Sequence, residues 1–180
     1  DMLHKGKLSG ETVVATVMSN LGLHQFVKEH GMKLECTNVG DRNVLERMLE
    51  KGYAIGGEQS GHMIFLEHAT TGDGELTALQ MLALLKESGK KASEVFGACP
   101  RYPQVLINIP VANNDAKKAI MASEALAQAV AGEEEKLGDD GRVLVRPSGT
   151  EALMRVMVEA KTEQTAQEAA QRLADLIAKL

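Results

Sequence analysis

Thr12-Val13-Val14-Ala15-Thr16-Val17-Met18 is a β-branched, apolar run of the kind that forms a strand buried on both faces of a sheet. A helix is predicted from Asn20 to about His30, where Gly31 ends it, and an alternating strand follows over 33–39. A further helix over 44–51 leads to a short strand over 53–57. This alternation predicts an α/β layered domain with a mostly parallel sheet, whose ligands bind beyond the carboxyl ends of the strands.

The second part of the chain has a different order of elements. A fourth strand over 62–66 and a long helix over 75–88 complete the first domain, and Cys99-Pro100 then marks a break. We therefore predict domains at 1–98 and 99–180. The second is expected to be a smaller α+β domain, with an antiparallel sheet packed by helices. Its elements are a strand over 104–111, a helix over 115–136, two strands flanking 146–151 and a closing helix over 163–180. One stripe of that last helix should pack on the sheet: Ala169, Leu173, Leu176, Ile177 and Leu180.

Composition excludes several classes of function. The chain has 180 residues, 44% of them apolar, so it can bury a core. A net charge of −5 and only 3% aromatic residues argue against nucleic acid as a partner. No apolar run approaches the length of a membrane span, and no leader opens the chain. Cys36 and Cys99 are expected to be reduced, buried thiols, which favours a cytoplasmic protein. The chain begins within what reads as a helix end, so we expect a piece of a longer protein.

Residues 146–151, Arg-Pro-Ser-Gly-Thr-Glu, stand between the two last strands and are called the phosphate loop here. Arg146 supplies a fork of charged donors, Ser148 and Thr150 supply hydroxyls, and Gly149 allows backbone N–H groups to approach an oxyanion. Arg155, in the second strand, adds another guanidinium. The alternative is an ordinary hairpin turn.

Residues 56–62, Gly-Gly-Glu-Gln-Ser-Gly-His, are called the sugar loop and follow a predicted strand at its carboxyl end. Glu58 can accept hydrogen bonds from two adjacent sugar hydroxyls, and Ser60 can donate or accept one. His62 can bind the ligand, exchange a proton or simply order the loop. The alternative for this segment is a glycine-rich hairpin without a ligand.

Other polar residues have simpler interpretations. Asp41 caps the helix that follows it or contributes to the site, and Arg42 is then free to meet an anion. Asp73 reads first as a helix cap and only second as a metal ligand. Residues 133–135, three consecutive glutamates, are expected to be the solvated end of a helix.

Four segments together resemble the bacterial phosphoglucosamine mutases of the α-D-phosphohexomutase superfamily. They are 16–22 (Thr-Val-Met-Ser-Asn-Leu-Gly), 39–42 (Val-Gly-Asp-Arg), the sugar loop and 141–151, which contains the phosphate loop. The similarity runs in order along the whole chain. One departure is Ala152, where members of the family commonly have Pro after Ser-Gly-Thr-Glu. Its N–H and freer φ should alter the loop's rigidity slightly but none of its donors.

The resemblance implies that this chain corresponds to the third and fourth of four domains. The phosphorylated serine and the Mg²⁺ site would lie on the two absent domains, so no catalytic residue and no metal ligand is expected here. The complete enzyme would interconvert glucosamine 6-phosphate and glucosamine 1-phosphate through glucosamine 1,6-bisphosphate, for UDP-N-acetylglucosamine and cell-wall synthesis, and it could form a homodimer. The isolated chain should be inactive.

By the same resemblance, the residues that bind substrate divide into two groups. Arg146, Ser148, Gly149, Thr150 and Arg155 would bind phosphate; Glu58, Ser60 and His62 would bind the sugar; Asp41 and Arg42 would be further polar residues of the active site. Two alternatives stay open. The chain could belong to another hexose mutase, specific for glucose or mannose phosphates, or it could be a non-catalytic module that binds phosphosugars.

Overall fold

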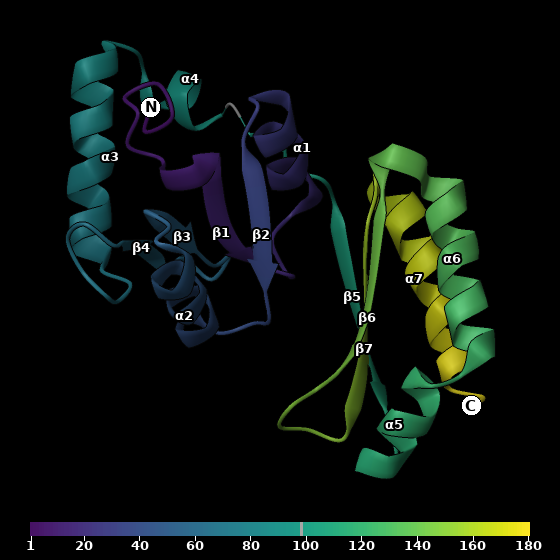
Figure 1. Ribbon diagram of the computed structural model, residues 1–180. Coiled ribbons are helices and arrows are strands. Elements are labelled where there is room, and N and C mark those ends of the chain that lie inside the picture. Colours follow the sequence, from purple (N-terminus) through teal and green to yellow (C-terminus); the bar gives the residue numbers. More distant parts are fainter. Residues whose placement is uncertain (98) are drawn as a thin grey trace. The chain divides into compact units, whose positions relative to one another are not determined.

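The computed structural model describes residues 1–97 and 99–180, which divide into two compact units, Asp1–Arg101 and Tyr102–Leu180 (Figure 1). Ala98, the last residue of the predicted first domain, lies outside the described residues.

The first unit is an α/β layer, as predicted. Its sheet has the strand order β2-β1-β3-β4, in which β1 pairs in parallel with β2 and β3, and β4 pairs antiparallel with β3. The elements are η1 (Ser9–Glu11), β1 (Thr12–Thr16), α1 (Leu21–Glu29), β2 (Lys33–Thr37), α2 (Asp41–Lys51), β3 (Ile55–Gly57), β4 (Met63–Phe65), α3 (Gly74–Ser88) and α4 (Ala92–Phe96). The parallel pairing places the loops that follow β1, β2 and β3 at one edge of the sheet.

Local sequence signals set most of these boundaries. The side chain of Asn20 caps α1 by accepting a hydrogen bond from the Gly22 amide, and Asp73 caps α3 by accepting one from Leu76. The cap predicted for Asp73 is therefore confirmed. Val14 in β1 and Val44 in α2 are fully buried in the core of this unit, which they form together with Met48 and Ile64.

Gly22 marks a close approach between two segments that are far apart in sequence. A Cβ built on Gly22 would lie 1.6 Å from the carbonyl oxygen of Pro100, which no side chain can tolerate. The segment that follows α4 therefore lies directly against the first turn of α1, and only glycine leaves room for it.

Neither cysteine forms a disulfide, as predicted, but the prediction that they are buried is wrong. Cys36 lies on β2, an edge strand of the sheet, and Cys99 lies in the segment that follows α4; both are exposed.

The second unit is the predicted α+β arrangement. Its antiparallel sheet has the order β5-β7-β6, with α6 and α7 stacked on one side (Figure 1). The elements are β5 (Gln104–Pro110), α5 (Asn114–Met121), α6 (Glu124–Leu137), η2 (Gly138–Asp140), β6 (Arg142–Pro147), β7 (Leu153–Glu159) and α7 (Glu163–Ile177). The single helix predicted over 115–136 is in fact two, because the hydroxyl of Ser123 caps α6 by accepting a hydrogen bond from the Leu126 amide.

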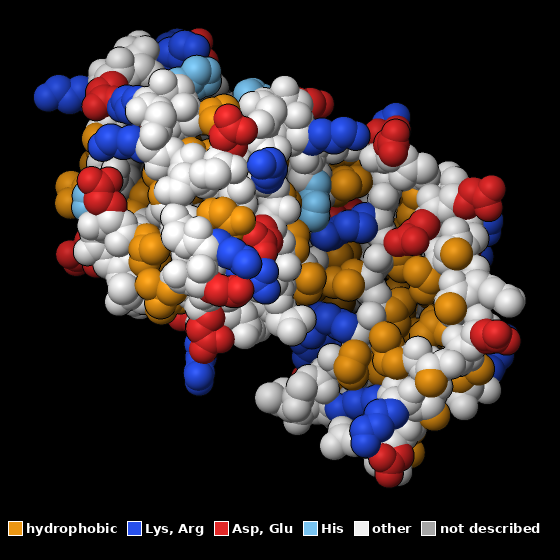
Figure 2. Space-filling model, in the orientation of Figure 1, with side chains coloured by type: hydrophobic (Ala, Val, Ile, Leu, Met, Phe, Trp, Pro, Cys, Tyr) orange, Lys and Arg blue, Asp and Glu red, His pale blue; other side chains and the backbone are white. Residues whose placement is uncertain are grey.

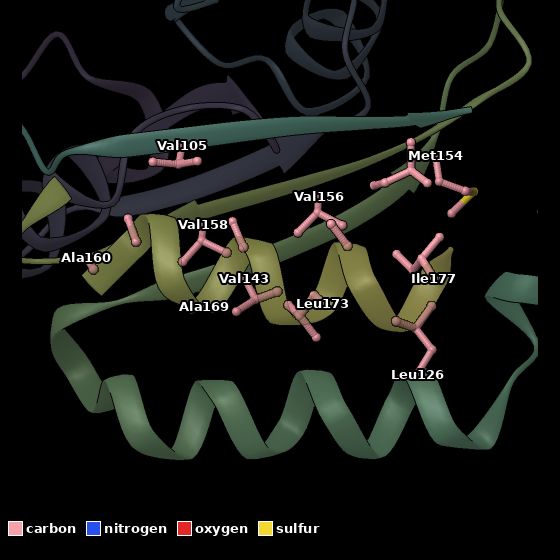
Figure 3. Close-up of a cluster of buried hydrophobic side chains, with 14 of the residues drawn as sticks. Val105, Leu126, Val143, Met154, Val156, Val158, Ala160, Ala169, Leu173 and Ile177 are labelled. Atoms are coloured by element: carbon pink, nitrogen blue, oxygen red, sulfur yellow. The ribbon is translucent and has the colours of Figure 1, made fainter. Parts of the chain in front are cut away.

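The core of this unit lies between α7 and the inner face of the sheet (Figure 3). Val156 and Val158 point from β7 toward Ala169 and Leu173 on α7, and all four are at most 1% exposed. The predicted stripe holds for Ala169, Leu173 and Ile177. Leu176 is only half-buried, and Leu180, beyond the end of the helix, is 53% exposed.

Glu133 is buried, so the expectation that residues 133–135 form a solvated helix end is wrong for this residue. Its carboxylate is buried against α7, where it accepts hydrogen bonds of 2.9 and 2.7 Å from Nε and Nη2 of Arg172. Lys136 donates a third, at 2.8 Å. Glu134 and Glu135 are exposed as expected. The three donors, with Arg172 first, hold the pKa of Glu133 at about 2, against the opposing effect of burial.

We expect Glu133→Gln to lower the stability of the second unit by about 1–3 kcal/mol, because it removes a charge that two cations face. The folded pKa lies below the ordinary value of 4.5, so this stabilisation is complete above pH 4.5 and is lost as the pH falls toward 2. Urea unfolding between pH 2 and 7 measures the effect. The acid-induced loss of stability should be smaller in Glu133→Gln, whereas Glu134→Gln should behave as wild type. Parallel pH profiles for Glu133→Gln and wild type would contradict the assignment.

Candidate functional site

The phosphate loop joins β6 to β7, and the register of the sheet brings its two arginines together. Arg146 on β6 is the direct cross-strand partner of Arg155 on β7, which in turn faces Asn108 on β5. Directly paired residues of antiparallel strands project from the same face. Arg146 and Arg155, predicted as phosphate ligands from separate strands, therefore form one pair of cations.

This pair of arginines is incompletely neutralised. Nη2 of Arg155 donates to Glu151 at 2.7 Å, but the buried Nε atoms of both Arg146 and Arg155 have no hydrogen-bond partner. Burial, and then the charge of Arg155, lower the pKa of Arg146. Two like charges with buried, unused donors are destabilising unless an anion completes them, so the arrangement fits phosphate or carboxylate.

The rest of the phosphate loop is an ordered turn. The Ser148 amide donates to the Leu153 carbonyl at 2.8 Å, and its hydroxyl accepts from the Glu151 amide at 3.2 Å. Ser148 is buried, whereas Gly149 and Thr150 are exposed. A Cβ on Gly149 would meet nothing within 4 Å, so the packing of the protein leaves the outer side of the loop open.

Lys117 is a residue of this region that the sequence did not single out. It lies on α5, is 6% exposed, and donates from Nζ to the carbonyls of Ser148, at 2.8 Å, and of Glu151. Its neighbour Lys118 points to solvent, and nothing in the pair Lys117-Lys118 distinguishes the buried member.

The sugar loop begins in β3 and turns into β4. Glu58 is half-buried, and its Oε1 accepts a hydrogen bond of 2.8 Å from the Gly40 amide in the loop that follows β2. Gly40 has φ 126°, a conformation that side chains rarely adopt. Glu58 therefore ties two of the predicted loops together, and its second carboxylate oxygen is left for other donors.

Ser60 and His62 lie close together on the exposed turn of the sugar loop. The hydroxyl of Ser60 is 3.3 Å from Nδ1 of His62, and the Glu58 amide donates to the His62 carbonyl at 2.9 Å. Gly72 packs against the His62 side chain, since a Cβ there would lie 3.1 Å from it. The hydroxyl and the imidazole can thus act on one ligand group.

A hollow of about 220 Å³ lies beside the sugar loop, between β1 and β3. Glu58 and Gln59 line it from one side, and Ser19 and Asn20, which follow β1, line it from the other. Ser19 and Asn20 stand within the segment 16–22 quoted above, but their side chains were not predicted as part of the site. The signal that points to them is their place after the carboxyl end of a parallel strand.

Asp41 and Arg42, the two remaining predicted residues, lie at the start of α2. Gly40, not Asp41, is the N-cap of α2; Asp41 is its first residue and accepts a hydrogen bond from the Arg42 amide at 2.8 Å. Of the two interpretations of Asp41, the helix cap is therefore wrong, and a role in the site stays a prediction. Arg42 is not free either, because Nε donates to Glu46 at 2.8 Å, and this raises the pKa of Arg42.

The described residues do not offer the ligands of a metal centre. No group of three or more His, Cys, Asp or Glu side chains among residues 1–97 and 99–180 is placed to hold an ion. None of the helices in these two ranges is both long and apolar enough to cross a membrane. Acidic and basic side chains are interspersed over the visible surface of each unit (Figure 2).

Comparison with protein families matches both units. Residues 1–102 match the phosphoglucomutase/phosphomannomutase α/β/α domain III, and residues 106–176 match the C-terminal domain of the same family. The chain belongs to this phosphohexomutase family. The model of domain III covers the sugar loop, and that of the C-terminal domain covers the phosphate loop.

Curated relatives include two bacterial phosphoglucosamine mutases. The protein of Saccharopolyspora erythraea is 52% identical over 177 residues, and that of Caldanaerobacter subterraneus subsp. tengcongensis is 51% identical over the same length. Each comparison covers 98% of this chain but 39% of the relative. The chain thus spans about two fifths of the length of these relatives.

Solved structures share the fold. N-acetylphosphoglucosamine mutase of Aspergillus fumigatus superposes with a TM-score of 0.80 at 20% identity, covering 93% of this chain and 38% of that one. The same enzyme in complex with GlcNAc-6P and magnesium gives 0.78 at 20% identity, again with 93% and 38% covered. A third structure, in complex with glucose 1,6-bisphosphate, gives 0.76 at 21% identity with the same coverage.

Proposed function

We propose that this chain is the substrate-binding C-terminal part of a phosphoglucosamine mutase, which interconverts glucosamine 6-phosphate and glucosamine 1-phosphate. The observation that carries the proposal is the identity of about half of all residues to enzymes of that name, over 98% of this chain. Another hexose mutase of the family is the second candidate, because the family models cover phosphoglucomutases and phosphomannomutases alike.

The site chemistry supports a reaction in which a bisphosphate intermediate turns end for end. Such a ligand presents one phosphate to a fixed binding site while the other is transferred, so the protein needs donors that accept either end. Arg146 and Arg155 provide guanidinium groups, and Ser148, Gly149 and Thr150 provide the loop around them. Glu58, Ser60 and His62 would hold the sugar hydroxyls in both orientations.

Phosphoryl transfer itself is assigned to parts of the enzyme outside this chain. Mg²⁺ would neutralise charge on the transferred group, and no group of three or more His, Cys, Asp or Glu side chains in residues 1–97 and 99–180 is placed to hold it. We assign this chain binding and orientation only, and we expect the isolated 180 residues to turn over neither hexose phosphate. Cys36 and Cys99 are thiols that form no disulfide, which favours a reducing compartment, and we place the protein in the cytoplasm.

An assay of the complete parent protein tests the proposal. Purified enzyme supplied with glucosamine 6-phosphate, glucose 6-phosphate or mannose 6-phosphate should convert the amino sugar with the highest kcat/KM. A higher kcat/KM for glucose or mannose phosphate would support the second candidate instead. If enzyme that carries phosphoserine and is supplied with Mg²⁺ shows no mutase activity, the proposal fails and a non-catalytic module that binds phosphosugars is the remaining alternative.

We expect Glu58→Ala and Glu58→Gln to weaken binding of glucosamine 6-phosphate by the complete protein by roughly tenfold, because a half-buried carboxylate that accepts from sugar hydroxyls is lost. Binding of inorganic phosphate should not change. Glu58→Gln keeps an oxygen for the Gly40 amide, so it separates loss of charge from loss of that link between loops. Calorimetric titration measures both ligands, with the exposed Glu67→Gln as control. Equal losses for phosphate and sugar phosphate would contradict a sugar-specific role.

A further inference from the structure

Lys117 is buried although it lies on a short helix whose other charged residues face solvent. The side chain of Lys118 is 79% exposed and that of Asp115 is 90% exposed, whereas Lys117 is 6% exposed. Burying an ammonium group is unfavourable unless it is fully hydrogen-bonded. Nζ of Lys117 donates to two backbone carbonyls of the phosphate loop, those of Ser148 and Glu151.

These two contacts fix the directions of two peptide groups in the phosphate loop. In a trans peptide the N–H of a residue points opposite to the preceding carbonyl, and no peptide bond within residues 99–180 is cis. Because the Ser148 carbonyl points at Lys117, the Gly149 N–H points away from Lys117. The same argument turns the Ala152 N–H away from Lys117.

The positive charge also strengthens the donor that it orients. An ammonium group bonded to a carbonyl polarises that peptide, so the N–H at its other end becomes a better donor to an anion. The Gly149 side of the loop is open, since no atom lies within 4 Å of a Cβ built there. A phosphate held by Arg146 and Arg155 would therefore meet a fixed and polarised amide.

We propose that Lys117 is a positioning residue of the phosphate site: through the carbonyls of Ser148 and Glu151 it orients the backbone amides of the loop toward the bound phosphate. It does not touch the ligand. The inference rests on the proposed function, in that it takes the loop to be a phosphate site.

The test uses the ¹⁵N-labelled 180-residue chain, titrated with inorganic phosphate and with glucosamine 6-phosphate, and follows amide NMR signals. Lys117→Met should weaken binding of both ligands by roughly tenfold, since the orienting donor is lost, and should abolish the shift of the Gly149 amide. Lys117→Arg, which keeps charge and donors, should restore that shift. Lys118→Met, a change of the same type one residue away, should match wild type.

Signals of Val156 and Val158 in β7 report whether each variant is folded. If Lys117→Met does not fold, Lys117→Gln, which keeps one donor, takes its place. A folded variant that binds phosphate within twofold of wild type, with the Gly149 shift intact, would overturn the positioning role alone. Wild type that shows no shift in the loop with either ligand would overturn the phosphate site itself, and the inference with it.

Discussion

Arg146→Ala is expected to weaken phosphosugar binding by about 100-fold and, at the same time, to leave the second unit as stable as wild type or slightly more so. The loss follows from removing a forked, charged donor from a desolvated anion site. The gain follows because Arg146 stands directly across from Arg155, with a buried Nε that has no partner in the free protein. The two effects have opposite signs because the arginine pair is arranged for a ligand.

Calorimetric titration with glucosamine 6-phosphate and thermal unfolding without ligand check both effects on the same samples. Arg146→Lys keeps the charge but loses the forked pair of donors, so its affinity for glucosamine 6-phosphate should lie between those of wild type and Arg146→Ala. The exposed Arg101→Ala controls for loss of one positive charge. A large fall in the unfolding temperature of Arg146→Ala would mean that the residue is mainly structural.

Leu173→Ala should destabilise the second unit by about 3 kcal/mol, because the side chain is 1% exposed between α7 and the sheet and the cavity cannot collapse fully. In a unit of this size, that corresponds to a fall of about 15 °C in the midpoint of thermal unfolding. Differential scanning calorimetry measures it. Leu180→Ala, the same change at a position that is 53% exposed, should stay within about 0.5 kcal/mol of wild type. Equal effects at both positions would contradict the packing described.

Much of the fold follows from patterns that are local in the sequence. The β-branched run at 12–16 predicts β1 because such residues suit a strand covered on both faces, and Asn20 and Asp73 mark helix starts through hydrogen bonds to amides two or three residues away. The order of elements then predicts the parallel sheet. These signals act over a few residues and can be recognised without the tertiary structure.

Features that depend on distant partners were predicted less well. Glu133 reads as solvated until Arg172, 39 residues away, is placed beside it. Lys117 differs from Lys118 only through the loop that packs against α5. Cys36 is exposed because β2 lies at the sheet edge, a fact of strand order rather than of composition.

The candidate site shows the same division. The residue types and positions of the two loops are sufficient to propose phosphate and sugar ligands. The cross-strand pairing of Arg146 with Arg155, and the bond from Gly40 to Glu58, depend on register and on the meeting of two loops. Neither can be derived from spacing along the chain.

The contact between Gly22 and Pro100 determines where the two halves can be separated. The peptide at Pro100 covers the start of α1, so the residues up to Arg101 are part of the first unit in structure and not merely a tether. A cut before Pro100 would expose the start of α1 and leave residues 100–101, which belong to the first unit, attached to the second. Expression of the units as separate proteins therefore calls for a division after Arg101, which keeps Gly22 and Pro100 in the same polypeptide.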